Sequence, residues 1–198
     1  MAGNTRVPKV EITGIYGGML KIAMRKMLGE VPESAEVMWH NPKVFKVLMG
    51  FGRKAEKKWD RIDPNLAALA SMAAAGVVGC SFCLDLAYFM VHNKGLDEGK
   101  AREVPRWRQS DLFTPLERRV MAYAEAVSQT PPAVTDEMSA ALLKELGAPA
   151  LLELTARIGA MNLTARTNIA LGIKAQGFSA ACGLEPLATQ SADVVSSA

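Results

Sequence analysis

Apolar residues recur at intervals of three and four along most of the chain, which is the spacing of one face of an α-helix. No stretch alternates apolar and polar residues beside turn residues, the pattern expected of a half-buried strand. The sequence therefore predicts an all-α protein, a single domain built as a bundle of about seven helices. The predicted helices cover residues 19–28, 43–58, 64–76, 79–93, a short piece after 97, 115–130, 135–146 and 149–176.

Several predicted helices have recognisable ends. Thr114 and Glu117 have the spacing of a capping box, in which each side chain bonds the other residue's backbone N–H. Asp63 is a good N-cap residue, and Pro64 directly after it suits the first helical position. Gly177 is predicted to end the last and longest helix.

Glycine and proline divide the chain into three parts. They punctuate residues 1–32, which we predict to form an N-terminal arm with one short helix. Residues 33–183 carry the helical domain. From residue 184 the composition shifts to Ala, Ser, Thr, Gln and Val, so residues 184–198 are predicted to form a flexible C-terminal tail.

Composition and charge narrow the class of protein. The chain has 198 residues, 49% hydrophobic and 22% charged, which fits a globular fold and excludes a disordered one. The formal charge of +3 is too small to indicate a nucleic-acid partner. Residues 21–63 are more basic, but no aromatic residues interleave with the charges as stacking on bases would require. We therefore expect no nucleic-acid binding.

One apolar run is long enough to cross a bilayer. Residues Leu66 to Leu84 carry no formal charge over 19 positions. Gly76 and Gly79 interrupt this run, so we predict a pair of buried helices and no membrane partner. No apolar segment with a small-residue cleavage site follows the start of the chain, and we expect the protein in the cytoplasm.

The chemically distinctive feature is a pair of thiols, Cys80 and Cys83, at the start of a predicted helix. Three residues of separation place both sulfurs on one face, close enough for a disulfide. Backbone N–H groups and the helix dipole favour an anion there, so the pKa of a thiol is expected to fall. A thiolate at neutral pH is a nucleophile towards a peroxide or another disulfide.

Other interpretations of the pair remain open. A structural zinc site needs four ligands, and only Cys182, His40 and His92 could complete one, so we expect no metal and no cofactor. A thioredoxin-type motif should follow a strand, and none is predicted. The two cysteines could also be packing residues without chemistry.

The chain resembles the carboxymuconolactone decarboxylase and alkylhydroperoxidase D-like superfamily over residues 35–180. The residues that carry the resemblance are Val77-Val78-Gly79, Cys80 to Asp85, Leu116-Glu117-Arg118, Tyr123 to Ala126, Glu153-Leu154-Thr155, and Asn162 through Arg166 and Asn168 to Gly172 and Gly177-Phe178. The resemblance implies an all-helical homo-oligomer.

Peroxidases of this family use the two cysteines as a dithiol. By this resemblance Cys83 attacks a hydroperoxide, and Cys80 resolves the sulfenic acid into a disulfide. The partners implied are a hydroperoxide or other small-molecule substrate and an external dithiol protein that reduces the pair. The helix dipole alone does not choose between the cysteines, since Cys80 is nearer the helix start.

The chain departs from the family at two positions. Family peroxidases have a Glu twelve residues before the first Cys and a His four residues after the second, which together move the thiol proton. Ala68 and Ala87 occupy these positions and can accept no proton.

Three residues are candidates for supporting roles. Asp85 could orient a water or cap its own helix, and we favour a cap-like or surface role. Asn162 and Arg166 share a helix face, from which Asn168 is displaced. Arg166 could supply positive charge to a thiol, or it could bond helix-end carbonyls or a second subunit.

The leading hypothesis is a thiol–disulfide peroxidase that acts through Cys80 and Cys83. A decarboxylase-like lyase of the same superfamily is the first alternative. A non-catalytic oligomeric binding protein that has lost the proton relay is the second.

Overall fold

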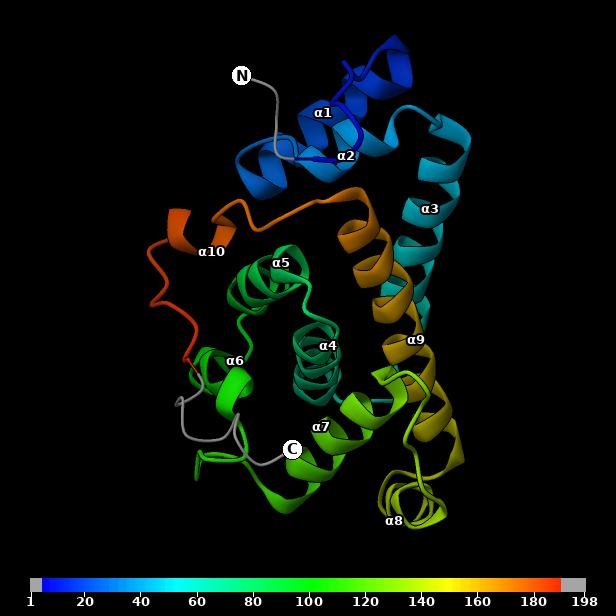
Figure 1. Ribbon diagram of the computed structural model, residues 1–198, viewed down its shortest axis with the longest axis vertical. Coiled ribbons are helices and arrows are strands. Elements are labelled where there is room, and N and C mark those ends of the chain that lie inside the picture. Colours follow the sequence, from blue (N-terminus) through cyan, green and yellow to red (C-terminus); the bar gives the residue numbers. More distant parts are fainter. Residues whose placement is uncertain (1–4, 190–198) are drawn as a thin grey trace.

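The computed structural model describes residues 5–189 and confirms the all-α fold. Within these residues the chain forms ten α-helices, one 3₁₀ turn and no strand (Figure 1). The helices are α1 (Gly14–Leu28), α2 (Glu33–Met38), α3 (Pro42–Lys58), α4 (Pro64–Val78), α5 (Ser81–Asn93), α6 (Glu98–Glu103), α7 (Pro115–Ser128), α8 (Asp136–Leu146), α9 (Ala148–Leu171) and α10 (Phe178–Ala181), with the 3₁₀ turn at Val104–Arg106.

The described chain has more helices than the seven or so that the pattern predicts. The helices that the prediction omits are α2 and α10, of 6 and 4 residues. Neither completes two turns, so neither contains enough positions for a helical period to be recognised.

Helix α4 lies at the centre of the fold, where α5, α7 and α9 pack around it (Figure 1). More than half of its residues are buried, and most of the buried ones are alanines. Small side chains let neighbouring helices approach closely from several sides. The uncharged run from Leu66 to Leu84 therefore covers most of α4 and the first turn of α5, two helices with buried faces, as predicted. Among the described helices, none is long and apolar enough to cross a membrane.

The predicted caps are present. The Thr114 hydroxyl accepts the Glu117 backbone N–H at 3.3 Å, and the Glu117 carboxylate accepts the Thr114 N–H at 2.7 Å. Asp63 accepts the backbone N–H groups of Asn65 and Leu66. These bonds satisfy N–H groups that have no partner inside the helix, and they fix where α7 and α4 begin.

The predicted end of the last helix is wrong. Helix α9 ends at Leu171, because Gly172 adopts the left-handed conformation with φ +74° and its N–H caps the final turn. Gly177, the predicted terminator, instead precedes α10. The chain between the two glycines is free to turn back across the start of α5 (Figure 1).

Both predicted flanking segments contact the helical core. Arg6 donates from its backbone and its guanidinium to the carbonyls of Leu171, Ile169 and Ala170, which end α9. The segment predicted as a tail begins with residues 184–189, where Leu184 and Leu187 pack against the core and Ala188 donates to a carbonyl of α6. Residues 190–198 lie outside the described part of the chain.

Candidate active site

A sharp turn between α4 and α5 carries the cysteine pair. Gly79 has φ +83°, a conformation that favours glycine, and its N–H donates to the last carbonyls of α4. Cys80 follows as the N-cap residue of α5, and its Sγ accepts the backbone N–H of Cys83 at 3.2 Å. The predicted position of the pair at a helix start is confirmed.

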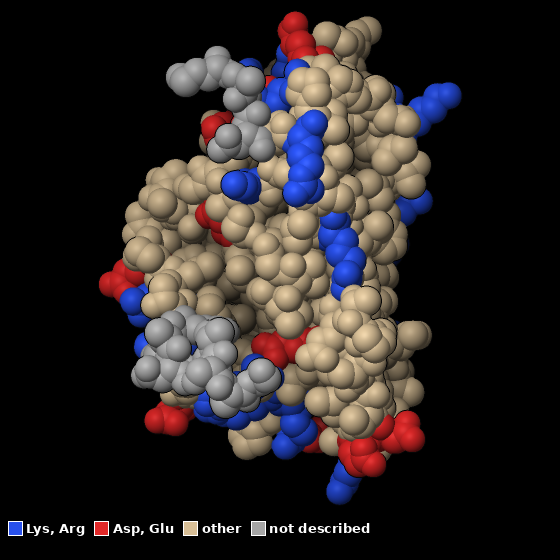
Figure 2. All heavy atoms as spheres, in the orientation of Figure 1, with Lys and Arg blue, Asp and Glu red and all other residues tan. Residues whose placement is uncertain are grey.

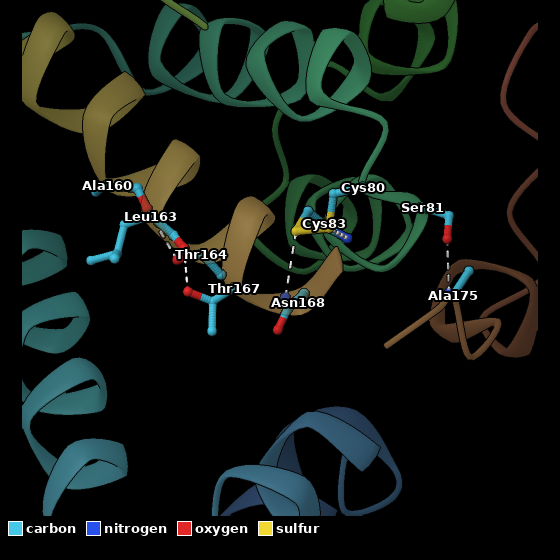
Figure 3. The surroundings of a disulfide bond; sticks show 9 residues. All are labelled: Cys80, Ser81, Cys83, Ala160, Leu163, Thr164, Thr167, Asn168 and Ala175. Carbon is cyan, nitrogen blue, oxygen red and sulfur yellow. Dashed lines mark hydrogen bonds between the residues drawn. A yellow bond between two sulfur atoms is a disulfide. The ribbon is translucent and has the colours of Figure 1, made fainter. Parts of the chain in front are cut away.

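Cys80 and Cys83 are joined as a disulfide, with their Cα atoms 5.2 Å apart (Figure 3). Cys80 is 1% exposed and Cys83 is 4% exposed. The bond lies in an apolar cluster that also contains Ala75, Phe82 and Phe178. The rings of Phe82 and Phe178 meet edge to face. The sulfurs are therefore held in surroundings that exclude bulk water.

Asn168 is the polar side chain that meets the sulfur pair. Its Nδ2 donates to Cys83 Sγ at 3.6 Å, a length suited to the large sulfur atom, and the residue is 1% exposed (Figure 3). Its Oδ1 is buried without a hydrogen-bond partner among the described residues. The structure thus brings together Cys80, Cys83 and Asn168.

Asn168 was not among the predicted site residues, although a signal for it exists in the sequence. The apolar stripe of α9 runs through Ile158, Met161 and Ala165, and its next position is 168. A polar residue on an otherwise apolar stripe marks a buried group that needs a specific partner. Asn162 and Arg166 drew the prediction to another face of the helix.

Asp85 neither touches the sulfurs nor caps its own helix. Its carboxylate accepts the backbone N–H groups of residues 176–179 at 2.7 to 3.2 Å and the Ser179 hydroxyl at 2.7 Å. Burial alone would raise the pKa of Asp85, but the hydrogen bonds from Ser179, Phe178 and Gly177 outweigh it and hold that pKa below its ordinary value. Asp85 therefore fixes α10, and Phe178 with it, against α5.

Arg166 and Asn162 join α9 to the end of α7. Arg166 donates to the Ser128 carbonyl at 2.8 Å and to the Thr130 hydroxyl at 3.0 Å. Asn162 donates to the Ser128 hydroxyl at 2.7 Å. Of the two predicted roles for Arg166, these contacts match bonding to a helix-end carbonyl.

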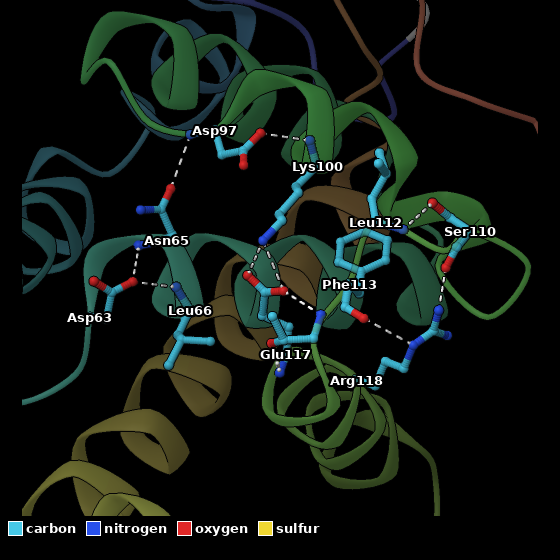
Figure 4. A network of polar contacts seen from close by, with 11 residues as sticks. Asp63, Asn65, Leu66, Asp97, Lys100, Ser110, Leu112, Phe113, Glu117 and Arg118 are labelled. Atoms are coloured by element: carbon cyan, nitrogen blue, oxygen red, sulfur yellow. Dashed lines mark hydrogen bonds and ion pairs between the residues drawn. The ribbon is translucent and has the colours of Figure 1, made fainter.

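Ala68, at the position where family peroxidases have the proton-moving Glu, lies in a separate polar region. Ala68 lines a cavity of about 150 Å³ together with Lys100 and Glu117. Lys100 Nζ contacts both carboxylate oxygens of Glu117, at 2.7 and 3.0 Å (Figure 4). Burial would raise the pKa of Glu117, but the bonds from Lys100 and Thr114 lower it overall. Ala87, at the second relay position, packs against the core beside α4.

The three other residues that a zinc site would have needed are dispersed. His92 Nδ1 contacts Glu98 at 2.8 Å, His40 Nε2 contacts the Pro8 carbonyl at 2.8 Å, and Cys182 is an exposed free thiol. In the described part of the chain, no three His, Cys, Asp or Glu side chains are grouped so that they could hold a metal ion.

Comparison with known proteins identifies relatives of this chain. The family model described as "Carboxymuconolactone decarboxylase family" matches residues 42–126. The Escherichia coli K12 protein named "Uncharacterized protein YnjA" is 39% identical over 154 residues, which cover 78% of this chain and 85% of that protein.

Two solved structures share the fold. A variant of the debrominase Bmp8 in complex with 2,3,4-tribromopyrrole superposes with a TM-score of 0.76 at 19% identity, covering 89% of this chain and 96% of that one. A peroxidase-related protein of Ralstonia eutropha JMP134 with an alkylhydroperoxidase AhpD core superposes with a TM-score of 0.75 at 14% identity, covering 90% and 96%. At these identities the two structures establish the fold alone.

Proposed function

The chain belongs to the carboxymuconolactone decarboxylase family, and from this premise we propose that it is a thiol–disulfide peroxidase that reduces hydroperoxides through Cys80 and Cys83. The observation that carries the proposal is the disulfide between these two residues at the start of α5. The bond is the oxidised product that such a reaction leaves behind. The AhpD core of the Ralstonia eutropha protein supports the same assignment.

The reaction balances with two thiols and one hydroperoxide. The Cys83 thiolate attacks the outer oxygen of the hydroperoxide, so that an S–O bond forms, the O–O bond breaks and an alkoxide leaves to take a proton from water. The Cys80 thiolate then attacks the sulfur of the Cys83 sulfenic acid, closing the disulfide and releasing hydroxide, which is protonated to water. An external dithiol protein supplies the two electrons that restore both thiols.

Two contacts support this division of roles. The Cys80 sulfur already accepts the Cys83 N–H at the helix start, where a thiolate leaving group or resolving nucleophile is stabilised. The Cys83 sulfur faces Asn168 on the neighbouring helix. Asp85 supports the site indirectly, by holding Phe178 over the apolar cluster.

Burial of the sulfurs sets a condition on the reaction. Val7 and Leu28, from the N-terminal arm, pack against the cluster that contains the disulfide, and Val37 of α2 belongs to that cluster. We infer that the hydroperoxide and the reductant reach the sulfurs when this covering segment moves aside. Because the cycle ends with reduction by a dithiol protein, the reducing cytoplasm is the compartment we propose.

An exposed apolar face supports the proposed homo-oligomer. Val44, Val47 and Phe51 lie at helical spacing on α3 and are 51%, 69% and 43% exposed. Figure 2 shows one face of the molecule, on which residues other than Lys, Arg, Asp and Glu, polar and apolar alike, cover most of the surface. Apolar side chains in such an arrangement favour contact with a second copy of the chain. Light scattering after size exclusion measures the mass directly.

The test uses three matched cysteine variants, Cys83→Ser, Cys80→Ser and the control Cys182→Ser. We expect Cys83→Ser to reduce peroxide at the background rate, and Cys80→Ser to consume about one equivalent and stop at the sulfenic acid. Cys182→Ser should retain full activity, because Cys182 is exposed and distant in sequence from the pair.

Two results would contradict the proposal. Activity on a muconolactone-type acid that survives loss of both cysteines would assign the lyase alternative. Wild-type protein that shows neither this activity nor peroxide reduction, given a dithiol reductant, would assign the binding alternative.

A further inference from the structure

The amide of Asn168 is the one polar side chain in contact with the sulfur pair in the described part of the chain. It comes from α9, 85 residues after Cys83, and is 1% exposed. Its nitrogen points towards Cys83 and its oxygen points away from the sulfur (Figure 3). Only one end of the amide is therefore used.

The unused end is unusual for a buried group. Among the described residues, Asn168 Oδ1 is the only buried side-chain nitrogen or oxygen without a partner. Native proteins leave few such atoms, and each calls for an explanation. With its oxygen unbonded, no second hydrogen bond fixes which end of the side-chain amide faces the sulfur.

We propose that Asn168 is a positioning residue for Cys83. Asn168 donates from Nδ2 to the Cys83 sulfur when that sulfur is a thiolate. It turns to accept through Oδ1 when Cys83 carries a thiol S–H or a sulfenic acid O–H. This inference rests on the dithiol chemistry proposed for Cys83. A neutral amide has a donor at one end and an acceptor at the other, and half a turn exchanges the two. It can therefore bond both the deprotonated and the protonated form of Cys83. No proton passes through the amide, which stays neutral throughout.

The same arrangement explains how the site tolerates Ala68 and Ala87. A hydrogen bond to an anion is about twice as strong as one between neutral groups. Donation from Asn168 therefore stabilises the thiolate more than acceptance stabilises the thiol, and lowers the pKa of Cys83. The start of α5 acts in the same direction.

Several charged groups on the elements around Cys83 are engaged elsewhere. On α5, Asp85 is bound by residues 176–179. On α9, Arg166 is bound to Ser128 and Thr130. The Arg6 guanidinium donates to carbonyls at the end of α9. On α2, Glu33 and Glu36 contact Lys9 at 2.9 and 3.9 Å. Among the groups named here, Asn168 and the start of α5 are therefore the ones that contact Cys83.

The test measures the pH profile of alkylation at Cys83 in the reduced full chain, with mass-spectrometric resolution of each cysteine. Asn168→Leu keeps a similar volume and removes the donor. We expect it to raise the pKa of Cys83 by about one unit, so that alkylation below that pKa slows about tenfold. Asn168→Ser restores a small donor and should recover part of the shift.

Asn162→Leu is the matched control, because it removes the same side chain from the same helix where that side chain bonds Ser128. It should leave the pKa of Cys83 unchanged. An unchanged pKa in both Asn168 variants, or an equal shift in Asn162→Leu, would overturn the inference. Should Asn168→Leu fail to fold, Asn168→Ser still gives the comparison.

The same experiment separates the two proposals. A shifted pKa in Asn168→Leu, together with wild-type protein that reduces no peroxide, supports the role of Asn168 at the thiolate and rejects the peroxidase. Peroxide reduction by wild type with an unshifted pKa supports the peroxidase and rejects the role of Asn168.

Discussion

The two polar regions beside α4 are built in opposite ways. One region is the cavity that Ala68 lines. There Lys100 donates to Glu117, and Glu117 also accepts the Thr114 N–H. At the start of α5, two sulfurs lie in an apolar cluster with one amide, whose oxygen has no partner among the described residues. The first region uses its polar atoms to hold helices together. The second keeps a donor and an acceptor available for a group that changes its protonation state.

Asp85 should show the largest effect, because it supports the sulfur region with a saturated set of bonds. Asp85→Asn replaces one accepting carboxylate oxygen by an NH2 group, removes the negative charge and leaves at least one of these backbone N–H groups without an acceptor, so we expect a loss of about 3 kcal/mol in the free energy of unfolding. Since Phe178 is then released, alkylation of reduced Cys83 should also become faster. Urea unfolding and site-resolved alkylation measure the two effects.

Ser179→Ala is the graded control for this prediction. It removes the hydroxyl bond to Asp85 and keeps the backbone N–H bond, so the expected loss is about 1 kcal/mol. A loss as large as that of Asp85→Asn would show that the carboxylate is not the main anchor of α10.

Glu117→Gln should destabilise the protein without changing the thiols. The variant loses the charge that pairs with Lys100 at 2.7 Å, and we expect about 2 kcal/mol less stability in urea. The rate of alkylation at Cys83 should match wild type. A change in that rate would show that the two regions are coupled and would break the comparison.

Thr114→Ala should have a smaller effect at the same region. It removes the hydroxyl that accepts the Glu117 N–H and leaves the carboxylate in place, at an expected loss of about 1 kcal/mol in urea unfolding. Equal losses for Thr114→Ala and Glu117→Gln would indicate that the cap, and not the ion pair, carries the stability.

Mild changes of pH should have the least effect. The pKa values of Asp85 and Glu117 are both below their ordinary values in the folded protein. Their contributions are therefore complete above the unfolded pKa values near about 4 and are lost only as the pH falls through the lower folded values. Urea midpoints should be nearly constant between about pH 8 and pH 6 and fall in acid, and Asp85→Asn should fall less steeply. A fall that begins near neutral pH would assign the dependence to other groups.

Local sequence patterns predict the parts of this fold that depend on neighbours in the chain. The capping box of Thr114 and Glu117, the cap at Asp63 and the cysteine pair at a helix start all have their partners within three residues. They could be predicted because the backbone geometry of one helix turn fixes the contact.

The contacts that complete the site could not be predicted in this way. Asn168 meets Cys83 across 85 residues, and Asp85 meets residues 176–179 across more than 90. The second contact also depends on the end of α9 at Gly172, since a helix continued to Gly177 would carry these N–H groups away from Asp85. The packing of the helices determines long-range contacts of this kind, and the hydrophobic period of a single helix carries no information about that packing.

The disulfide joins residues only three apart in sequence, so breaking and forming it has little effect on the fold. The Cα atoms of Cys80 and Cys83 are 5.2 Å apart, and residues three apart in an α-helix are separated by about 5 Å. Reduction of the S–S bond therefore requires no movement of the backbone. A cross-link over so few residues restricts the unfolded chain by only about 2 kcal/mol, against roughly 4.7 kcal/mol for a loop of 100 residues. In the redox cycle that we propose, the protein would gain and lose two electrons while its architecture stays the same, which is what a reusable reagent requires.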